Sequence, residues 1–136
     1  MTRWVSSLAL GIAISGAAVQ AHHAISAFYD SSKQVTIEGA VREFQFINPH
    51  PILTMDVADG SDRTLEWRLE MDNRFELVGI GVKADTLRAG DRIIVTGSLS
   101  RERPQGLYIM RLDRPADGFR YEQVGASPRI RPGRNR

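Results

Sequence analysis

Hydrophobic and polar residues alternate along most of the chain from Lys33 onward, which is the period of half-buried β-strands. In the first such run the apolar residues stand at odd positions as far as Val41 and at even positions from Phe44. A change of phase by one residue needs an extra residue in the strand, so we expect a bulge or corner near Arg42-Glu43. Gly39, inside the same run, indicates a bend.

The segment Asn48-Pro49-His50-Pro51 separates this strand from the next two. Each proline biases the residue before it towards an extended conformation, so the loop is stiff and His50 is held within it. Residues 53–57 and 65–71 then alternate in the same way, and Asp59-Gly60 between them predicts a hairpin.

A short helix is predicted after the hairpin, capped by Asp72 or Asn73 and ended by Gly79 or Gly81. Two more strands follow at 92–100 and 107–112, and the pattern permits a last short strand at 119–124. Three strands, a helix and two strands, with a long and glycine-bent first strand, are typical of a five-stranded Greek-key barrel of the OB type. We therefore predict an all-β, OB-like barrel with one short helix, and an open sandwich or SH3-like barrel as the alternative.

The first 21 residues have the features of a secretory signal peptide. A basic start containing Arg3 precedes an apolar run from Trp4 to Val19, and Val19 and Ala21 are small residues at the positions that signal peptidase reads. The run is shorter than the about 20 apolar residues of a spanning helix, and serines and glycines interrupt it. We expect cleavage after Ala21, a periplasmic mature protein without a transmembrane segment, and a barrel domain at 22–124.

Composition narrows the chemistry of this domain. The chain has no cysteine, which excludes disulfides and thiolate metal sites. Its 18 basic and 16 acidic residues are unevenly placed, because four arginines lie in the last eight positions: Arg129, Arg131, Arg134 and Arg136. We expect residues 125–136 to be a disordered, arginine-rich tail with at most weak attraction to anionic surfaces, and no specific nucleic-acid site.

No pattern typical of an enzyme is present. The chain lacks a Gly-x-Ser-x-Gly elbow, a phosphate-binding loop and a His-Glu-x-x-His motif. Glu66, Arg68 and Glu70 alternate on one face of a predicted strand, and we interpret them as a solvated salt-bridge ladder rather than an acid–base pair. We therefore favour a binding protein over an enzyme.

Several motifs occur together in a recognisable order: His22-His23 after the signal peptide, Phe46-Ile47-Asn48-Pro49-His50, Glu66-Trp67-Arg68-Leu69-Glu70, and Gly90-Asp91. In this order they resemble a family of small exported bacterial proteins catalogued as a domain of unknown function. The likeness covers residues 22–124, and the family usually has Trp where Phe46 stands. The resemblance implies export and an OB-like barrel, and it implies no activity.

Histidine is the residue type best suited to metal chemistry in this chain, which has three: His22, His23 and His50. Cleavage after Ala21 would give His22 a free amine, which together with its ring can chelate one ion, and His23 or His50 could add a further nitrogen. Nitrogen-rich coordination favours copper, with zinc as the alternative. Carboxylates that could complete the shell or orient a ring are Asp30, Glu66 and Glu70.

Two hypotheses for function follow from these residues. The first is a non-enzymatic periplasmic protein that binds a metal ion through His22, His23 and His50. The second is an interaction or assembly module of the cell envelope, in which a barrel face or the Asn-Pro-His loop docks a partner protein and the histidines are structural. The distance between His50 and the N-terminal pair distinguishes the two.

Overall fold

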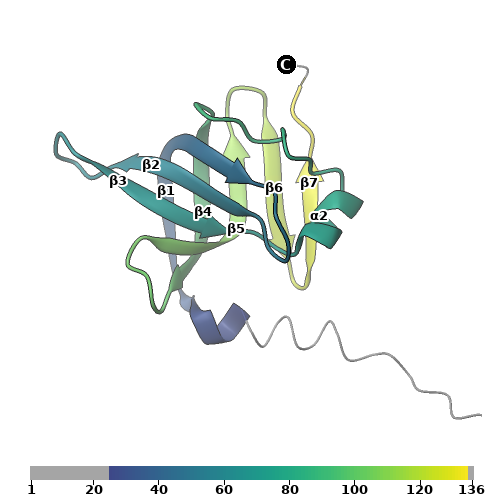
Figure 1. Cartoon of the computed structure of the whole chain (residues 1–136), viewed down its shortest axis with the longest axis horizontal. Coiled ribbons are helices and arrows are strands. Elements are labelled where there is room, and N and C mark those ends of the chain that lie inside the picture. The colour runs from purple at the N-terminus through teal and green to yellow at the C-terminus, as the bar shows by residue number, and fades with distance from the viewer. Residues whose placement is uncertain (1–24, 135–136) are drawn as a thin grey trace, which may run out of the picture.

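The computed structural model describes residues 25–134, and they form a mainly β structure in which seven strands make up one sheet. The strands are β1 (Tyr29–Gln45), β2 (Ile52–Ala58), β3 (Thr64–Glu70), β4 (Arg92–Ser100), β5 (Gly106–Arg114), β6 (Phe119–Val124) and β7 (Ser127–Arg131). The helix α2 (Arg74–Gly79) lies between β3 and β4, and residues 25–28 form one further helical turn (Figure 1).

Five of the strands form a ring. The sheet order is β3-β2-β1-β4-β5-β6-β7, all neighbours in that order being antiparallel, and β3 also pairs with β5 in parallel. The parallel pairing sets Arg68 against Gly106 and Glu70 against Tyr108, which joins the two ends of the β3-β2-β1-β4-β5 segment. The predicted all-β class is confirmed, with seven strands where five or six were expected.

The long strand β1 takes part in both halves of the ring because it bends. Its first part pairs with β4, its last part pairs with β2, and the register to β2 shifts between Val41 and Glu43. This is the bulge predicted from the change of phase. A Cβ at Gly39 would overlap the carbonyl oxygen of Asp56, so the close approach of β2 requires glycine there.

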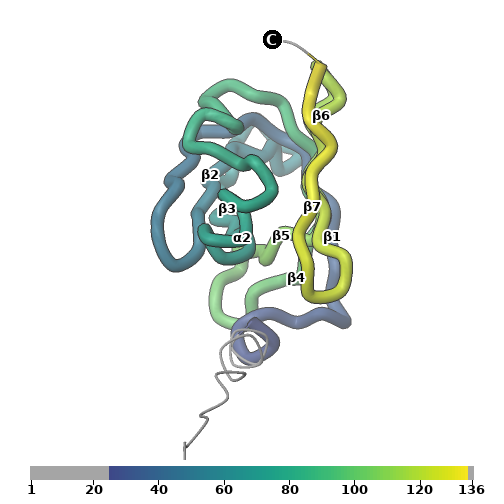
Figure 2. The backbone as a smooth tube through the Cα atoms, turned by 90° about the vertical axis from the view of Figure 1, so that its right-hand side faces the viewer, coloured from purple at the N-terminus to yellow at the C-terminus, as the bar shows by residue number. Residues whose placement is uncertain are grey.

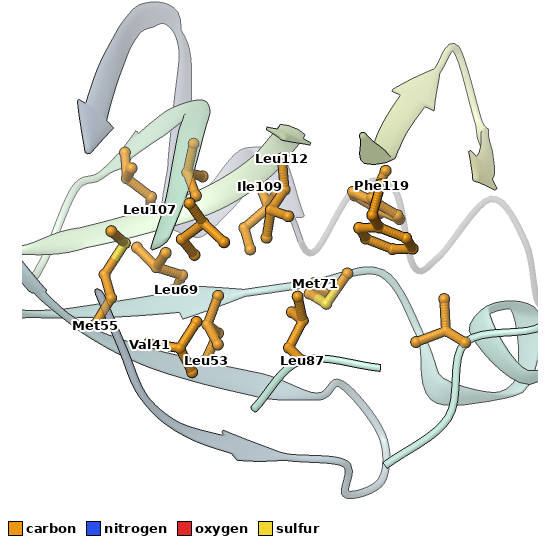
Figure 3. Packing of buried hydrophobic residues seen from close by; sticks show 14 of the residues in the cluster. Val41, Leu53, Met55, Leu69, Met71, Leu87, Leu107, Ile109, Leu112 and Phe119 are labelled. Carbon is orange, nitrogen blue, oxygen red and sulfur yellow. The ribbon is translucent and has the colours of Figure 1, made fainter. Parts of the chain in front are cut away.

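The core fills the ring and extends under the connection that follows α2 (Figure 3). Ring strands contribute residues that are fully buried, and Leu77 of α2 and Leu87 of the connection close one side. Those shown in Figure 3 include Val41, Leu53, Met55, Leu69, Leu107, Ile109 and Leu112.

The predicted helix is confirmed as α2. The side chain of Asn73 accepts a hydrogen bond from the backbone N–H of Glu76 at 2.9 Å, which is the N-cap interaction expected for that residue. Leu77 is buried, whereas Phe75 is 87% exposed. Neither α2 nor any other helix in residues 25–134 is long and apolar enough to cross a membrane.

The expectation of a disordered tail is wrong for Ser127–Arg131, which forms β7. This strand pairs with β6 in antiparallel register from Val124 opposite Ser127 to Arg120 opposite Arg131. Pro128 is buried, and Ile130 packs against the core. Backbone pairing and these two apolar contacts therefore order a segment whose composition suggested disorder. Figure 2 shows β7 running along one side of the molecule.

Candidate functional site

His50 lies in the loop between β1 and β2, and this loop is fixed to the start of α2. The carbonyl oxygen of Pro49 accepts from the N–H of Arg74 at 2.8 Å, and that of Pro51 accepts from the N–H of Met71 at 3.1 Å. The Asn48-Pro49 peptide bond is cis. The stiffness predicted for this loop thus has a structural basis beyond its prolines, namely two backbone hydrogen bonds to the segment after β3.

The imidazole of His50 is oriented by backbone and carboxylate oxygens. Its Nδ1 is 2.9 Å from the carbonyl oxygen of Met71 and 3.5 Å from Oε1 of Glu70, and the side chain is 20% exposed. Because a carbonyl oxygen only accepts hydrogen bonds, we infer that Nδ1 carries the proton. Nε2 then keeps its lone pair, and within residues 25–134 it has no hydrogen-bond partner.

Glu70 also binds the N-terminal part of the described chain. The hydroxyl of Tyr29, at the start of β1, donates to Oε2 of Glu70 at 2.7 Å. Burial and the neighbouring Glu70 raise the pKa of the Tyr29 phenol above its ordinary value, so it remains a donor at neutral pH. One carboxylate therefore links Tyr29 to His50.

The sequence-predicted metal ligands are only partly placed by the structure. His22 and His23 lie outside the described residues, so their approach to His50 stays a prediction. Among residues 25–134, no three histidine or carboxylate side chains gather into a group that could hold a metal ion. The described chain by itself contributes one histidine, His50, to the predicted site.

Only one of the three carboxylates proposed as partners lies at His50. Asp30 accepts from Ser32 at 2.6 Å and pairs with Arg101 at 3.5 Å, and Glu66 pairs with Arg42 at 2.6 Å. Sequence reasoning named Glu70 for this role, but it missed Tyr29. No periodicity marks Tyr29, and only its place shortly after His22-His23 could have drawn attention to it.

The predicted salt-bridge ladder of Glu66, Arg68 and Glu70 is wrong, and of these three residues only Glu66 belongs to the ion-pair cluster that the structure shows. Arg42, at the bulge of β1, pairs with Asp56 of β2 at 2.9 Å and with Glu66 of β3 at 2.6 Å. Arg68, which alternates with Glu66 and Glu70 along β3, makes no ion pair with any residue in 25–134. The ion pairs thus run across the strands rather than along one of them.

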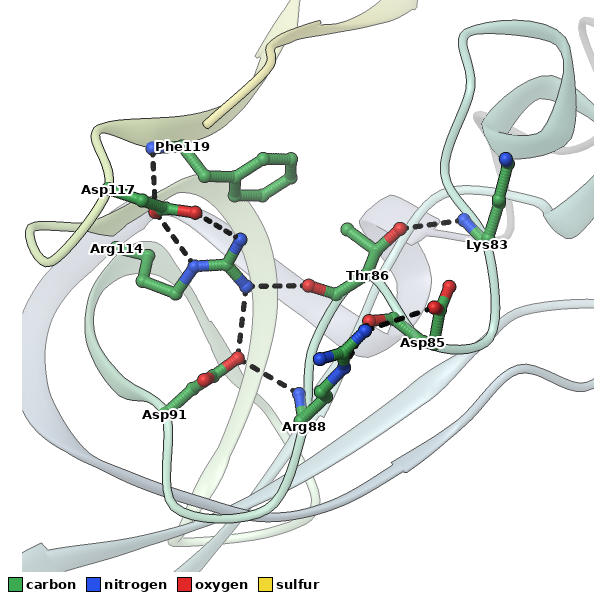
Figure 4. Close-up of polar contacts among 8 residues, drawn as sticks. All are labelled: Lys83, Asp85, Thr86, Arg88, Asp91, Arg114, Asp117 and Phe119. Atoms are coloured by element: carbon green, nitrogen blue, oxygen red, sulfur yellow. Dashed lines mark hydrogen bonds and ion pairs between the residues drawn. The ribbon is translucent and has the colours of Figure 1, made fainter. Parts of the chain in front are cut away.

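A second polar cluster surrounds Arg114, whose side chain is 6% exposed (Figure 4). Its guanidinium donates to both carboxylate oxygens of Asp117 at 2.9 and 2.8 Å, to Asp91 at 2.9 Å and to the carbonyl oxygen of Thr86 at 2.6 Å. Burial alone would lower the pKa of Arg114, but Asp117 and Asp91 outweigh it and raise that pKa. The ring of Phe119 covers the guanidinium, with its centre 4.9 Å from Cζ of Arg114.

The Arg114 cluster is structural rather than a ligand site. It borders a pocket of about 800 Å³, but its hydrogen bonds join the β5–β6 turn to the connection between α2 and β4. Four of the five N–H donors of a guanidinium are used in this way. The side chain therefore has little capacity left for a ligand.

Comparison with known proteins yields a family and no activity. The model of a family of unknown function, DUF6152, matches residues 10–108. No curated protein matches the sequence. Among solved structures, the chain is similar to one in the crystal structure of TiaS in complex with an isoleucine tRNA and ATP, at 15% identity and a TM-score of 0.45. That alignment covers 71% of this chain but only 24% of the other.

Proposed function

We propose that this chain, which belongs to DUF6152, a family of unknown function, is an exported periplasmic protein that binds a metal ion, with copper favoured over zinc. The ligands would be the amine and ring of His22, with ring nitrogens from His23 and His50. Cleavage after Ala21 would create the amine ligand. The order of strands around the ring, β1-β2-β3-β5-β4, supports the further proposal that the domain is an OB-type barrel.

The orientation of His50 is the observation that carries the proposal. A metal-binding histidine commonly donates its second ring N–H to a carbonyl or carboxylate, which fixes the tautomer and points the other nitrogen at the metal. His50 has this arrangement, with Met71 and Glu70 beside Nδ1 and with Nε2 unpartnered among residues 25–134.

The length of the N-terminal segment is compatible with a shared site. Tyr29 contacts Glu70, which lies beside His50, and His23 precedes Tyr29 by six residues. Six residues span about 20 Å when fully extended, and the helical turn at residues 25–28 makes this stretch shorter. Because Tyr29 contacts Glu70, the end of this six-residue stretch at Tyr29 lies close to His50.

Isothermal titration of the mature protein with Cu(II) and with Zn(II) tests the proposal. For a protein beginning at His22, we expect one tight site, weakened by His50→Ala by about tenfold or more, or about 1.4 kcal/mol. Glu70→Gln should weaken it within the range of about 10–100-fold that is usual for residues orienting a ligand. Acetylation of the His22 amine removes the amine ligand and keeps all three rings.

The variants separate a shared site from an N-terminal one. If acetylation of the His22 amine abolishes binding while His50→Ala leaves the affinity unchanged, His50 is not a ligand and the proposal fails. Thermal unfolding of each variant without metal controls for loss of the fold, because His50 also contacts the backbone of Met71.

A second candidate is an interaction module for another envelope protein, and one observation favours it. Phe75 and Val78 of α2 are 87% and 51% exposed, and Ile47 of the neighbouring loop is 49% exposed. An exposed apolar cluster rimmed by polar residues is typical of a protein-binding surface. Phe75→Ser should then prevent assembly with that partner in cells, measured by cross-linking from α2, and leave metal binding unchanged.

A further inference from the structure

Two arginines whose side chains have no partner within residues 25–134 share a polar trough beside β3. Arg68 lies on β3 and Arg103 in the loop between β4 and β5, which Figure 1 shows beside the ring. Both line a pocket of about 630 Å³ together with Tyr29 and Ser100, and both line an adjoining pocket of about 280 Å³ together with Thr54. The two pockets therefore meet at the two guanidinium groups.

Closure of the ring fixes the backbone that carries both arginines. The N–H of Arg68 donates to the carbonyl oxygen of Gln105 at 2.9 Å, and Arg68 pairs with Gly106 of β5. The hydroxyl oxygen of Ser100 accepts from the N–H of Arg103 at 3.1 Å and from that of Glu102 at 3.3 Å. The spacing of the two Cα atoms is thus set by the fold before any ligand arrives.

The two guanidiniums of the trough are not paired with any of its carboxylates within the described residues. Neither Arg68 nor Arg103 makes a side-chain hydrogen bond or ion pair in residues 25–134. Glu66 is paired with Arg42 at 2.6 Å, and Glu70 accepts from Tyr29 at 2.7 Å. Of the three carboxylates lining the trough, only Glu102 lacks a side-chain partner in this part of the chain, so the two guanidiniums are unpartnered although they do not outnumber the carboxylates.

The charges of both arginines act on the phenol of Tyr29. Burial and Glu70 raise the pKa of Tyr29, and the charges of Arg68 and Arg103 both act in the opposite direction. Tyr29 lines the larger pocket together with both arginines, so all three side chains border the same part of the trough.

We propose that this trough binds a phosphate group. Planar guanidinium groups bind phosphate oxygens through paired, charge-assisted hydrogen bonds, and two of them match the roughly two negative charges of a phosphate monoester. The phosphate could belong to a soluble ester or to a lipid headgroup. The site is separate from the histidine site, since Arg68 and Arg103 are not proposed as metal ligands.

Titration of the ¹⁵N-labelled mature protein with inorganic phosphate, at constant ionic strength and without metal, tests the proposal. We expect saturable amide shifts centred on Arg68, Arg103 and Gln105. Arg68→Gln and Arg103→Gln should each weaken binding by about tenfold or more, or about 1.4 kcal/mol. Glu102→Gln should strengthen it, because it removes the unpaired carboxylate.

Arg63→Gln is the matched control, since Arg63 is 81% exposed in the β2–β3 hairpin and does not line the trough. If this variant weakens phosphate binding as much as Arg68→Gln, the effect is one of surface charge and the proposal is wrong. Absence of saturable shifts, with no binding to vesicles of phosphatidic acid and phosphatidylcholine, would also overturn it.

The vesicles also distinguish the two sources of phosphate. Co-sedimentation that is lost in Arg68→Gln and Arg103→Gln but kept in Arg63→Gln assigns the trough to a lipid headgroup. Binding of inorganic phosphate with the same dependence on the variants, and no co-sedimentation, assigns it to a soluble phosphate compound.

Discussion

Asp117→Ala is expected to lower the free energy of unfolding by about 3–4 kcal/mol. Removing one partner from a buried ion pair costs about 3–5 kcal/mol, because the remaining charge stays out of water without compensation. The Arg114 side chain is 6% exposed and Asp117 binds it through two hydrogen bonds, but Asp91 remains at 2.9 Å and keeps part of the compensation. The lower part of that range therefore applies.

This loss should be visible in both chemical and thermal unfolding. Fluorescence of Trp67, the single tryptophan of residues 22–136, can follow urea unfolding of the mature protein. At about 4 °C per kcal/mol for a domain of this size, the melting temperature should fall by roughly 12–16 °C.

Asp85→Ala is the matched control for Asp117→Ala. Asp85 pairs with Arg88 at 3.2 Å in the same region, but the two side chains are 69% and 56% exposed, so we expect a loss of at most about 0.5 kcal/mol. If Asp117→Ala costs no more than Asp85→Ala, the buried Arg114 cluster does not hold the β5–β6 turn to the α2–β4 connection.

Two further predictions concern a close backbone contact and the tyrosines. Gly97→Ala should severely destabilise the protein in urea unfolding, because its Cβ would overlap the carbonyl oxygen of Tyr108, whereas Gly79→Ala, with nothing within 4 Å, should be neutral or stabilising by up to about 1 kcal/mol. Burial raises the pKa of all three tyrosines, Tyr29, Tyr108 and Tyr121. In the folded protein they should show no phenolate absorbance near pH ~10, where the unfolded chain titrates. The free energy of unfolding should keep its full value below that pH and fall above it, since only the unfolded state releases these protons there. Phenolate absorbance of the folded protein near pH ~10 would contradict this prediction.

Local features of the fold were predictable because the residues that cause them are close together in the sequence. The change of phase after Val41 predicted the bulge, Asp59-Gly60 predicted the β2–β3 hairpin, and Asn73 was one of two residues predicted to cap α2. Each depends on a few consecutive side chains and on backbone sterics.

Features that depend on distant partners were not predictable in the same way. β7 was missed because its composition is that of a tail, while its stability comes from pairing with β6 and from the contact of Ile130 with the core. Arg68 was expected to form the salt bridges of β3 because it lies between Glu66 and Glu70 along the strand. In the sheet, Asp56 stands opposite Glu66, and Arg42 at the bulge of β1 pairs with both.

The candidate site likewise combines a local feature, which the sequence predicts, with contacts between distant residues, which it does not. The prolines around His50 indicated a stiff loop, but the carbonyl of Met71 and the link from Tyr29 through Glu70 arise only when β3 and the start of β1 meet. Residue types alone identified a possible ligand. The protonation of Nδ1, inferred from the fold, is what makes Nε2 available.

Electron paramagnetic resonance of Cu(II) bound to the mature protein tests the central claim most directly, because the spectrum reports the nitrogens that coordinate the ion. We expect the signal of imidazole nitrogen to diminish in His50→Ala while coordination by the N-terminal amine persists. Identical spectra for the wild type and His50→Ala, with both proteins folded, would show that His50 is not a ligand and would contradict the account.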